Sequence, residues 1–167
     1  LIGMIAAQRA SADGFVSIAG AGRPAGVVLR EQLTAAPMPP EMRESALRGI
    51  AALESGHTAD STPPALAALF RPSVQPYLIS WLRYRPAEEL GRLGVPTLIV
   101  QGTTDVQVKV TDAEALKAGQ PRAQLLIVEG MNHVLKHETA MDMTAQMKSY
   151  GDPSLPVVPE LLRAIET

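Results

Sequence analysis

Two segments of the sequence end in residues that can perform acid–base chemistry together. T-L-I-V-Q-G-T-T-D ends at Asp105, and L-L-I-V-E-G-M-N-H ends at His133. In both segments a short apolar run is followed by a glycine, which permits a tight turn before the polar side chain. A carboxylate beside an imidazole fixes the tautomer of the ring and stabilises the imidazolium that forms on proton uptake. The two segments therefore predict a general-base site made of Asp105 and His133.

The elements that carry these residues form an alternating pattern. Both apolar runs are typical of strands, and residues 111–118 between them indicate a helix. An earlier apolar stretch, Phe15–Ala19, predicts another strand, preceded by a helix over residues 1–12. Strands that alternate with helices favour parallel pairing, so we expect an α/β fold with a three-stranded, mainly parallel sheet flanked by helices. Side chains that follow neighbouring parallel strands meet at one edge of the sheet.

Residues 25–93 contain no convincing strand. Several segments in this range begin at prolines and carry apolar residues at helical spacing, which predicts a set of short helices. The range is too apolar for a disordered linker. We therefore expect a core formed by residues 1–24 and 94–167, interrupted by a helical cap or lid insertion over 25–93.

Composition excludes several classes of function. The formal net charge of −2 argues against a nucleic-acid partner, which would need a basic face. The chain has no cysteine, so thiolate nucleophiles, disulfides and cysteine-bound zinc are excluded. No apolar run approaches the ~20 residues that a membrane span needs. We expect no metal and no cofactor.

The sequence V-P-T-L-I-V-Q-G-T-T-D, followed by a helix and then by L-L-I-V-E-G-M-N-H, resembles the C-terminal part of an α/β-hydrolase. The resemblance implies that Asp105 is the acid and His133 the general base of a Ser–His–Asp triad. It also implies that the insertion caps the site, and that the opening helix L-I-G-M-I-A-A-Q is the one that follows the nucleophile of that family. The resemblance covers nearly the whole chain but only the second half of the family's domain.

One part of the family's pattern is missing. The nucleophile motif G-x-S-x-G does not occur, because no serine of the chain has glycine two positions away on both sides. The loop that completes the oxyanion hole in the family is missing as well. We therefore expect a serine-hydrolase fragment of the esterase, lipase or peptidase type, acting on a small-molecule ester or amide when completed and inactive by itself. The alternative is a non-catalytic interaction or structural domain. These residues do not separate hydrolysis from acyl transfer or dehalogenation, and they leave substrate and localisation undetermined.

The remaining polar and sulfur-containing side chains have simpler interpretations. His57 and His137 lie among polar residues and are predicted to be surface residues. Asp112 is interpreted as a helix-capping residue that also complements the helix dipole. The methionines that follow the second predicted site strand are expected to pack flexibly near the site; they are Met131, Met141, Met143 and Met147.

The predicted strand Phe15–Ala19 has a consequence for assembly. In the family's strand order it would lack a neighbour on one side, and unpaired strand edges attract partners. We therefore expect a homodimer, or association with a complementary N-terminal fragment, through this edge and the helix face at Ile2 and Ile5.

Overall fold

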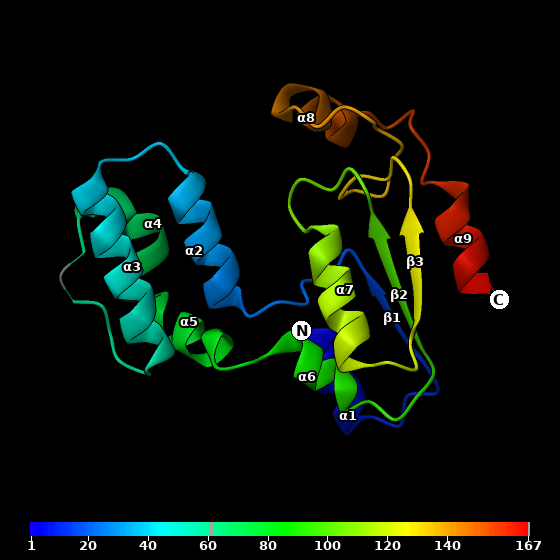
Figure 1. Cartoon of the computed structure of the whole chain (residues 1–167), viewed down its shortest axis with the longest axis horizontal. Helices are drawn as coiled ribbons and strands as arrows, with labels where there is room; N and C mark the ends of the chain where they lie inside the picture. Colours follow the sequence, from blue (N-terminus) through cyan, green and yellow to red (C-terminus); the bar gives the residue numbers. More distant parts are fainter. Residues whose placement is uncertain (61, 167) are drawn as a thin grey trace. The chain divides into compact units, whose positions relative to one another are not determined.

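The computed structural model describes residues 1–60 and 62–166, which form two compact units (Figure 1). The sheet unit consists of Leu1–Gly22 and the described residues from Pro86 onward. The helical unit consists of the described residues of Arg23–Arg85. Both candidate site residues belong to the sheet unit.

The sheet unit is built on three strands in the order β1-β2-β3, namely β1 (Phe15–Ile18), β2 (Thr97–Gly102) and β3 (Gln124–Val128). Both pairings are parallel, and Gly102 at the end of β2 lies opposite Val128 at the end of β3. The expected three-stranded parallel sheet flanked by helices is confirmed. Because β2 and β3 end side by side, the loops that follow them leave the sheet at the same edge.

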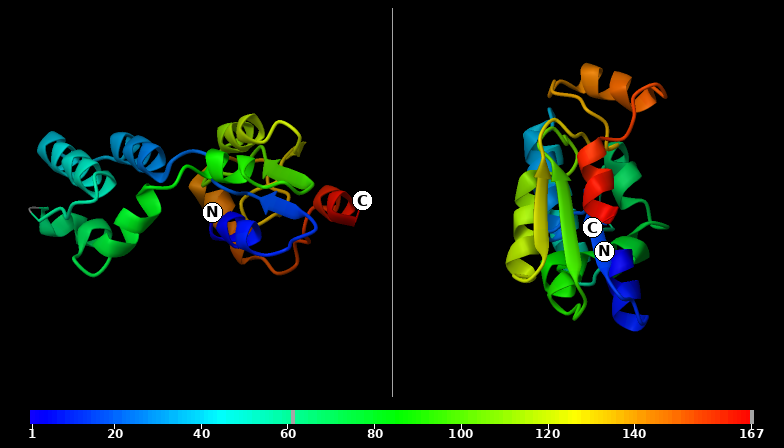
Figure 2. Two further views of the ribbon diagram at one scale, coloured as in Figure 1. Left: turned by 90° about the horizontal axis from the view of Figure 1, so that it is seen from below. Right: turned by 90° about the vertical axis from the view of Figure 1, so that its right-hand side faces the viewer.

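Two apolar clusters cover the two faces of the central strand. Ile99 and Val100 are neighbours on β2, so their side chains point to opposite faces. Figure 2 shows α7 (Val110–Gly119) and α9 (Pro159–Glu166) on opposite sides of the sheet. The first cluster includes Met4, Leu90, Leu93, Ile99, Ala113, Leu116 and Ala123; the second includes Val100, Val128, Met131, Val158 and Leu161. Burial on both faces explains why β2 is almost entirely apolar.

Helices α1 (Ile2–Arg9) and α6 (Pro86–Gly91) are joined by a partly buried polar contact. The Gln8 amide donates to the main-chain oxygen of Glu89 at 2.9 Å and to its carboxylate at 3.0 Å, and Arg92 also contacts this carboxylate. These contacts, led by that of Gln8, hold the pKa of Glu89 below its ordinary value although burial opposes the shift. The α6 segment, which the sequence placed within the insertion over 25–93, thus packs in the sheet unit.

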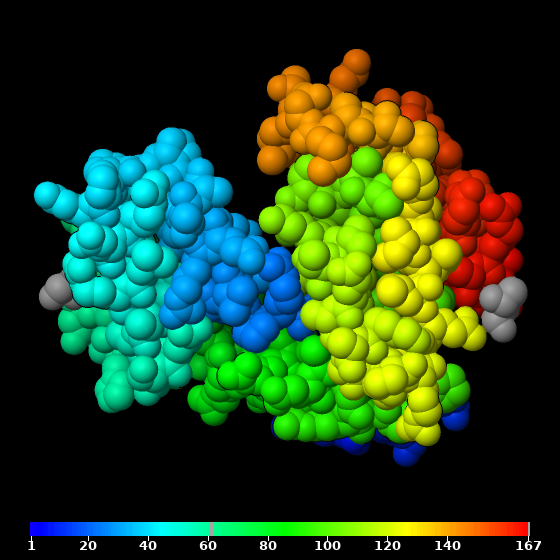
Figure 3. Space-filling view, in the orientation of Figure 1, coloured from blue at the N-terminus to red at the C-terminus, as the bar shows by residue number. Residues whose placement is uncertain are grey.

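A helix that the sequence did not predict lies beyond the carboxyl ends of the strands. Figure 3 shows this segment, α8 (Met143–Gly151), in orange against the tip of the sheet unit. Asp142 caps its first turn by accepting a hydrogen bond from Ala145 N at 3.0 Å. At its other end the Lys136 ammonium group donates to the main-chain oxygens of Ser149, Tyr150 and Asp152. The lysine thereby satisfies carbonyl groups that the end of a helix leaves unpaired.

The helical unit has its own apolar core. Its elements are α2 (Ala25–Ala35), α3 (Pro40–Glu54), η1 (Pro64–Leu66), α4 (Ala67–Phe70) and α5 (Gln75–Leu82). The core side chains are Ala25, Ala46, Ile50, Leu53, Ala59, Leu66, Phe70, Leu78 and Leu82. The described residues of this unit form no strand, in agreement with the sequence. In the part of the chain that is described, no helix is long and apolar enough to cross a membrane.

The outer edge of β1 is open. The N–H groups of Phe15 and Ala19 donate to main-chain oxygens on the β2 side, so those of Val16 and Ile18 face the opposite side. Among the described residues no strand pairs with that side. Val16 is 41% exposed and Ile2 on α1 is 81% exposed. The edge therefore presents unpaired backbone groups beside apolar side chains.

Candidate active site

The loop after β2 carries Asp105 and begins at a crowded position. A Cβ atom on Gly102 would collide with the backbone of Met131, which belongs to the loop after β3. Only glycine lets the two loops approach this closely. The backbone then turns through Thr103 and Thr104 and delivers Asp105 into the interior, where the residue is 4% exposed.

Hydrogen bonds hold both oxygens of the Asp105 carboxylate. The Oδ1 atom accepts from the main-chain N–H groups of Gln107 and Val108, at 2.8 and 2.9 Å. The Oδ2 atom accepts from the side-chain amide of Gln101 at 3.0 Å. A side-chain oxygen that accepts from main-chain N–H groups two and three residues ahead is typical of aspartate. These bonds fix the direction of the Asp105 side chain. One lone pair of Oδ2 remains for a further donor.

The loop after β3 is held by a buried asparagine. Gly130 adopts a φ of +69°, and Asn132 follows with no exposed surface. The Oδ1 atom of Asn132 accepts from the N–H groups of Val134 and Lys136, both at 3.1 Å, while its amide donates to the Ser149 hydroxyl at 2.9 Å. The asparagine thus ties the loop to itself and to α8. His133 therefore lies between Asn132, which is held by these bonds, and Val134, whose N–H group bonds to Asn132.

The two loops bring Asp105 and His133 into direct contact. His133 Nδ1 lies 2.9 Å from Asp105 Oδ2. The carboxylate side chain has no exposed surface, whereas the imidazole side chain is 30% exposed. Within the described residues, no hydrogen bond is made by His133 Nε2. A buried carboxylate beside Nδ1 favours the ring form that carries its proton there, and such a ring can accept a proton at Nε2.

The other residues that the sequence singled out lie outside this contact. His57 and His137 are exposed, in agreement with the prediction for both. Met131 is buried, but Met141, Met143 and Met147 are between 57% and 60% exposed. The expectation that these three methionines pack near the site is therefore wrong. For Met143 and Met147 the reason is that α8 buries its polar residues Gln146 and Ser149 instead.

Asp112 lies in the first turn of α7, where a carboxylate complements the helix dipole as expected. Its role as the cap is wrong, because α7 begins at Val110 and the capping position is Lys109, without a side-chain hydrogen bond. The Oδ1 atom of Asp112 instead accepts from Gly22 N at 3.1 Å. This buried contact joins α7 to the segment that follows β1.

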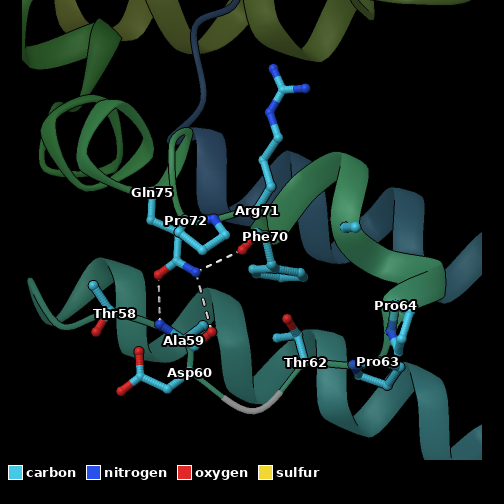
Figure 4. A pocket seen from close by; sticks show the side chains of 11 residues that line it. Thr58, Ala59, Asp60, Thr62, Pro63, Pro64, Phe70, Arg71, Pro72 and Gln75 are labelled. Atoms are coloured by element: carbon cyan, nitrogen blue, oxygen red, sulfur yellow. Dashed lines mark hydrogen bonds between the residues drawn. The ribbon is translucent and has the colours of Figure 1, made fainter.

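A hollow of about 360 Å³ lies within the helical unit, and Figure 4 shows its lining. Its polar centre is Gln75, whose Oε1 accepts from Ala59 N at 2.8 Å. The amide nitrogen of Gln75 donates to Phe70 O at 2.7 Å and to Ala59 O at 3.2 Å. All of these bonds hold the chain to itself, as the dashed lines in Figure 4 show. Both N–H groups and the oxygen of this amide are thus engaged by the main chain of the helical unit.

Three polar residues around the site were not predicted from the sequence. They are Gln101, which holds Asp105, and Asn132 and Lys136, which hold the loop of His133 and the end of α8. A signal was present for the first, because Gln101 is a polar residue directly after the apolar run of residues 98–100 in β2. For the other two, the contacts join the loop to a helix that the sequence did not reveal.

No family model matches the sequence, and a search of curated proteins found no relative. Among solved structures, the chain is similar to an alpha/beta fold family hydrolase from Bacillus anthracis, at 15% identity and a TM-score of 0.45 over 89% of this chain and 62% of that one. It is also similar to a meta-cleavage product hydrolase from Pseudomonas fluorescens, at 21% identity and a TM-score of 0.41 over 88% and 57%. A third is an enol-lactonase from Burkholderia xenovorans, at 15% identity and a TM-score of 0.38 over 75% and 52%.

The chain spans less than two thirds of the length of each of these proteins. At these identities and TM-scores the likeness concerns the fold and supports no statement about activity or substrate. One of them, the protein from Bacillus anthracis, is named an alpha/beta fold family hydrolase, and this chain is similar to it at the level of fold.

Proposed function

We propose that Asp105 and His133 form the acid and general-base pair of a serine-type hydrolase that cleaves an ester or amide bond. The observation that carries the proposal is the 2.9 Å contact between Asp105 Oδ2 and His133 Nδ1. Its support is the difference in exposure, since the carboxylate is enclosed and the imidazole reaches the surface. The likeness to solved structures adds nothing to this argument.

In the proposed reaction His133 Nε2 accepts the proton of a hydroxyl nucleophile as its oxygen attacks the carbonyl carbon. The imidazolium is stabilised by the Asp105 carboxylate, and the ring then returns the proton to the leaving group. The nucleophile is not assigned. No G-x-S-x-G motif occurs in the 167 residues, and no described hydroxyl group is hydrogen-bonded to His133.

The experiment is an ester-hydrolysis assay of the extended protein, meaning the chain together with any residues that its gene encodes before Leu1. The upstream sequence is first read for G-x-S-x-G, and the product is assayed with p-nitrophenyl butyrate. Asp105→Asn and His133→Ala should each lower kcat by about 10³- to 10⁴-fold. The matched control is His57→Ala, an exposed histidine of the helical unit, which should leave kcat unchanged. Retention of most activity by either site variant would overturn the proposal.

One observation favours a second candidate, a non-catalytic domain that keeps the fold. It is the lack of a hydroxyl partner for His133 Nε2 among the described residues. A fluorophosphonate probe, which labels only an activated serine, separates the candidates. Labelling of the extended protein, and its loss in His133→Ala, supports the hydrolase; no labelling of the extended protein supports the non-catalytic domain.

A further inference from the structure

Gln101 is a fully buried amide in the strand that leads to the site. It is the last residue but one of β2 and has no exposed surface. Its Nε2 atom lies 3.0 Å from Asp105 Oδ2 and 2.8 Å from the main-chain oxygen of Val108. The side chain thus bridges the carboxylate and the far end of the same loop.

The orientation of this amide is set by its neighbours. A carboxylate oxygen and a main-chain carbonyl oxygen can only accept hydrogen bonds, so the NH₂ group of Gln101 must face both of them. Each of its two hydrogens then has one of these acceptors, and the main-chain oxygen of Gly102 lies further away, at 3.5 Å. The opposite orientation would place the amide oxygen against the Asp105 carboxylate and lose both bonds.

The oxygen that Gln101 holds is the one that contacts His133. Asp105 Oδ1 is held by the backbone N–H groups of Gln107 and Val108, whereas Oδ2 is shared by Gln101 Nε2 and His133 Nδ1. Among the described residues, no other side chain forms a hydrogen bond with Asp105 Oδ2. Together with the two bonds to Oδ1, the amide therefore holds the carboxylate in the rotation that directs Oδ2 at the ring.

Burying the Gln101 amide carries an energetic cost that a role in packing alone does not explain. The Oε1 atom of Gln101 is buried and has no hydrogen-bond partner among the described residues. A leucine or methionine of similar size would remove this unpaired oxygen, but it would also take the donor away from Asp105 Oδ2 and from the main-chain oxygen of Val108. The donor function of the amide compensates for this unpaired oxygen.

We infer that Gln101 is a positioning residue that holds Asp105 Oδ2 against His133 Nδ1 and so keeps the imidazole in its Nδ1–H form. The inference rests on the proposed function, in which that tautomer leaves Nε2 free to act as the base. It assigns a role in the site to a residue outside the acid and histidine themselves.

The test uses NMR of the 167-residue chain labelled with ¹⁵N, and measures how fast the His133 Nδ1–H proton exchanges with water. In Gln101→Leu, exchange should be roughly tenfold faster than in the wild type, which corresponds to about 1.4 kcal/mol of lost protection. Gln101→Met is the second variant, since it keeps a flexible side chain of similar length if leucine impairs folding. Backbone amide spectra establish that each variant is folded.

The matched control is Gln146→Leu. Gln146 is also fully buried, its Nε2 donates to two main-chain oxygens, those of Thr104 and Ala140, and its Oε1 is also unpaired among the described residues. Neither of these hydrogen bonds involves Asp105 or His133. A general loss of packing would accelerate exchange in both leucine variants, whereas a positioning role accelerates it only in those at Gln101.

The outcomes separate this inference from the proposed function. If the wild-type ring shows no protected Nδ1–H proton, the Asp105–His133 pair is absent and the proposed function fails. If the wild-type proton is protected and remains equally protected in the folded Gln101 variants, only the role of Gln101 is overturned. Equal acceleration in Gln146→Leu would also overturn it.

Discussion

Replacing Asp105 by asparagine should invert the tautomer of His133. An asparagine can keep its Oδ1 atom on the N–H groups of Gln107 and Val108, as the carboxylate does at 2.8 and 2.9 Å. Its NH₂ group must then replace Oδ2 and face His133 Nδ1. The ring can pair with that group only by accepting at Nδ1, so the proton moves to Nε2 and the atom proposed as the base is blocked.

The size of the stability change follows from the bond at Gln101. In Asp105→Asn the new NH₂ group faces the donor Nε2 of Gln101, so the 3.0 Å hydrogen bond to a charged acceptor becomes a contact of two donors. Loss of such a bond costs about 1.5–3 kcal/mol, partly offset because asparagine carries no charge to desolvate. We expect a net destabilisation of about 2 kcal/mol.

Two measurements check this prediction. The ¹⁵N shifts of the His133 ring at about pH 9, above the ordinary imidazole range, report the tautomer, and urea unfolding reports stability. The matched control is Asp142→Asn at the exposed cap of α8, where asparagine caps as well as aspartate and neither quantity should change. An unchanged Nδ1–H tautomer in Asp105→Asn would refute the reasoning.

Three further predictions concern the frame of the site and its assembly. Because the pKa of Glu89 is lowered in the folded state, its ionised form adds stability above its ordinary value of 4.5, and this contribution is lost as the pH falls through the lowered pKa. Glu89→Gln should therefore lower the free energy of unfolding by about 1 kcal/mol at neutral pH but by much less at about pH 3. A stability difference between wild type and variant that does not change with pH would contradict this. Gly102→Ala should destabilise the chain by about 2–3 kcal/mol in urea unfolding, because the added Cβ meets the Met131 backbone. The control Gly94→Ala should cost under about 1 kcal/mol, because no atom lies within 4 Å of its added Cβ. Equal costs for the two variants would argue against the close approach of the loops at Gly102. We expect a second copy of the chain to pair along the open edge of β1. Sedimentation should then show a dimer that Val16→Lys converts to a monomer. A wild-type monomer at micromolar concentration would exclude this pairing.

The sheet and the meeting of Asp105 with His133 could be predicted from the sequence for a physical reason. Apolar runs bounded by glycine specify short buried strands, and neighbouring parallel strands bring whatever follows them to one edge. The chemical roles of the two residues stay predictions, as does the role of the helical unit as a cap. The hydrogen bond from Gln101 could not be predicted, because it depends on how the loop to Val108 turns.

The missed helix α8 shows what periodicity cannot reveal. Its buried side chains are the polar residues Gln146 and Ser149, while Met143 and Met147 point outward. A helix attached through hydrogen bonds has no apolar face, so the usual spacing signal is absent. The available sign was Asp142, a capping residue at its start. The stretch that forms α6 was expected only as part of the helical insertion. Its packing against α7 depends on Leu90, whose partners are mostly distant in sequence.

The most direct test of the account is the distance between Asp105 Oδ2 and His133 Nδ1 in a crystal structure of the chain. The account predicts a hydrogen bond at about the usual N–H···O distance of 2.7–3.2 Å, with the carboxylate enclosed and the ring reaching solvent. A structure in which the two side chains are out of contact, or in which Asp105 is directed to solvent, would contradict it.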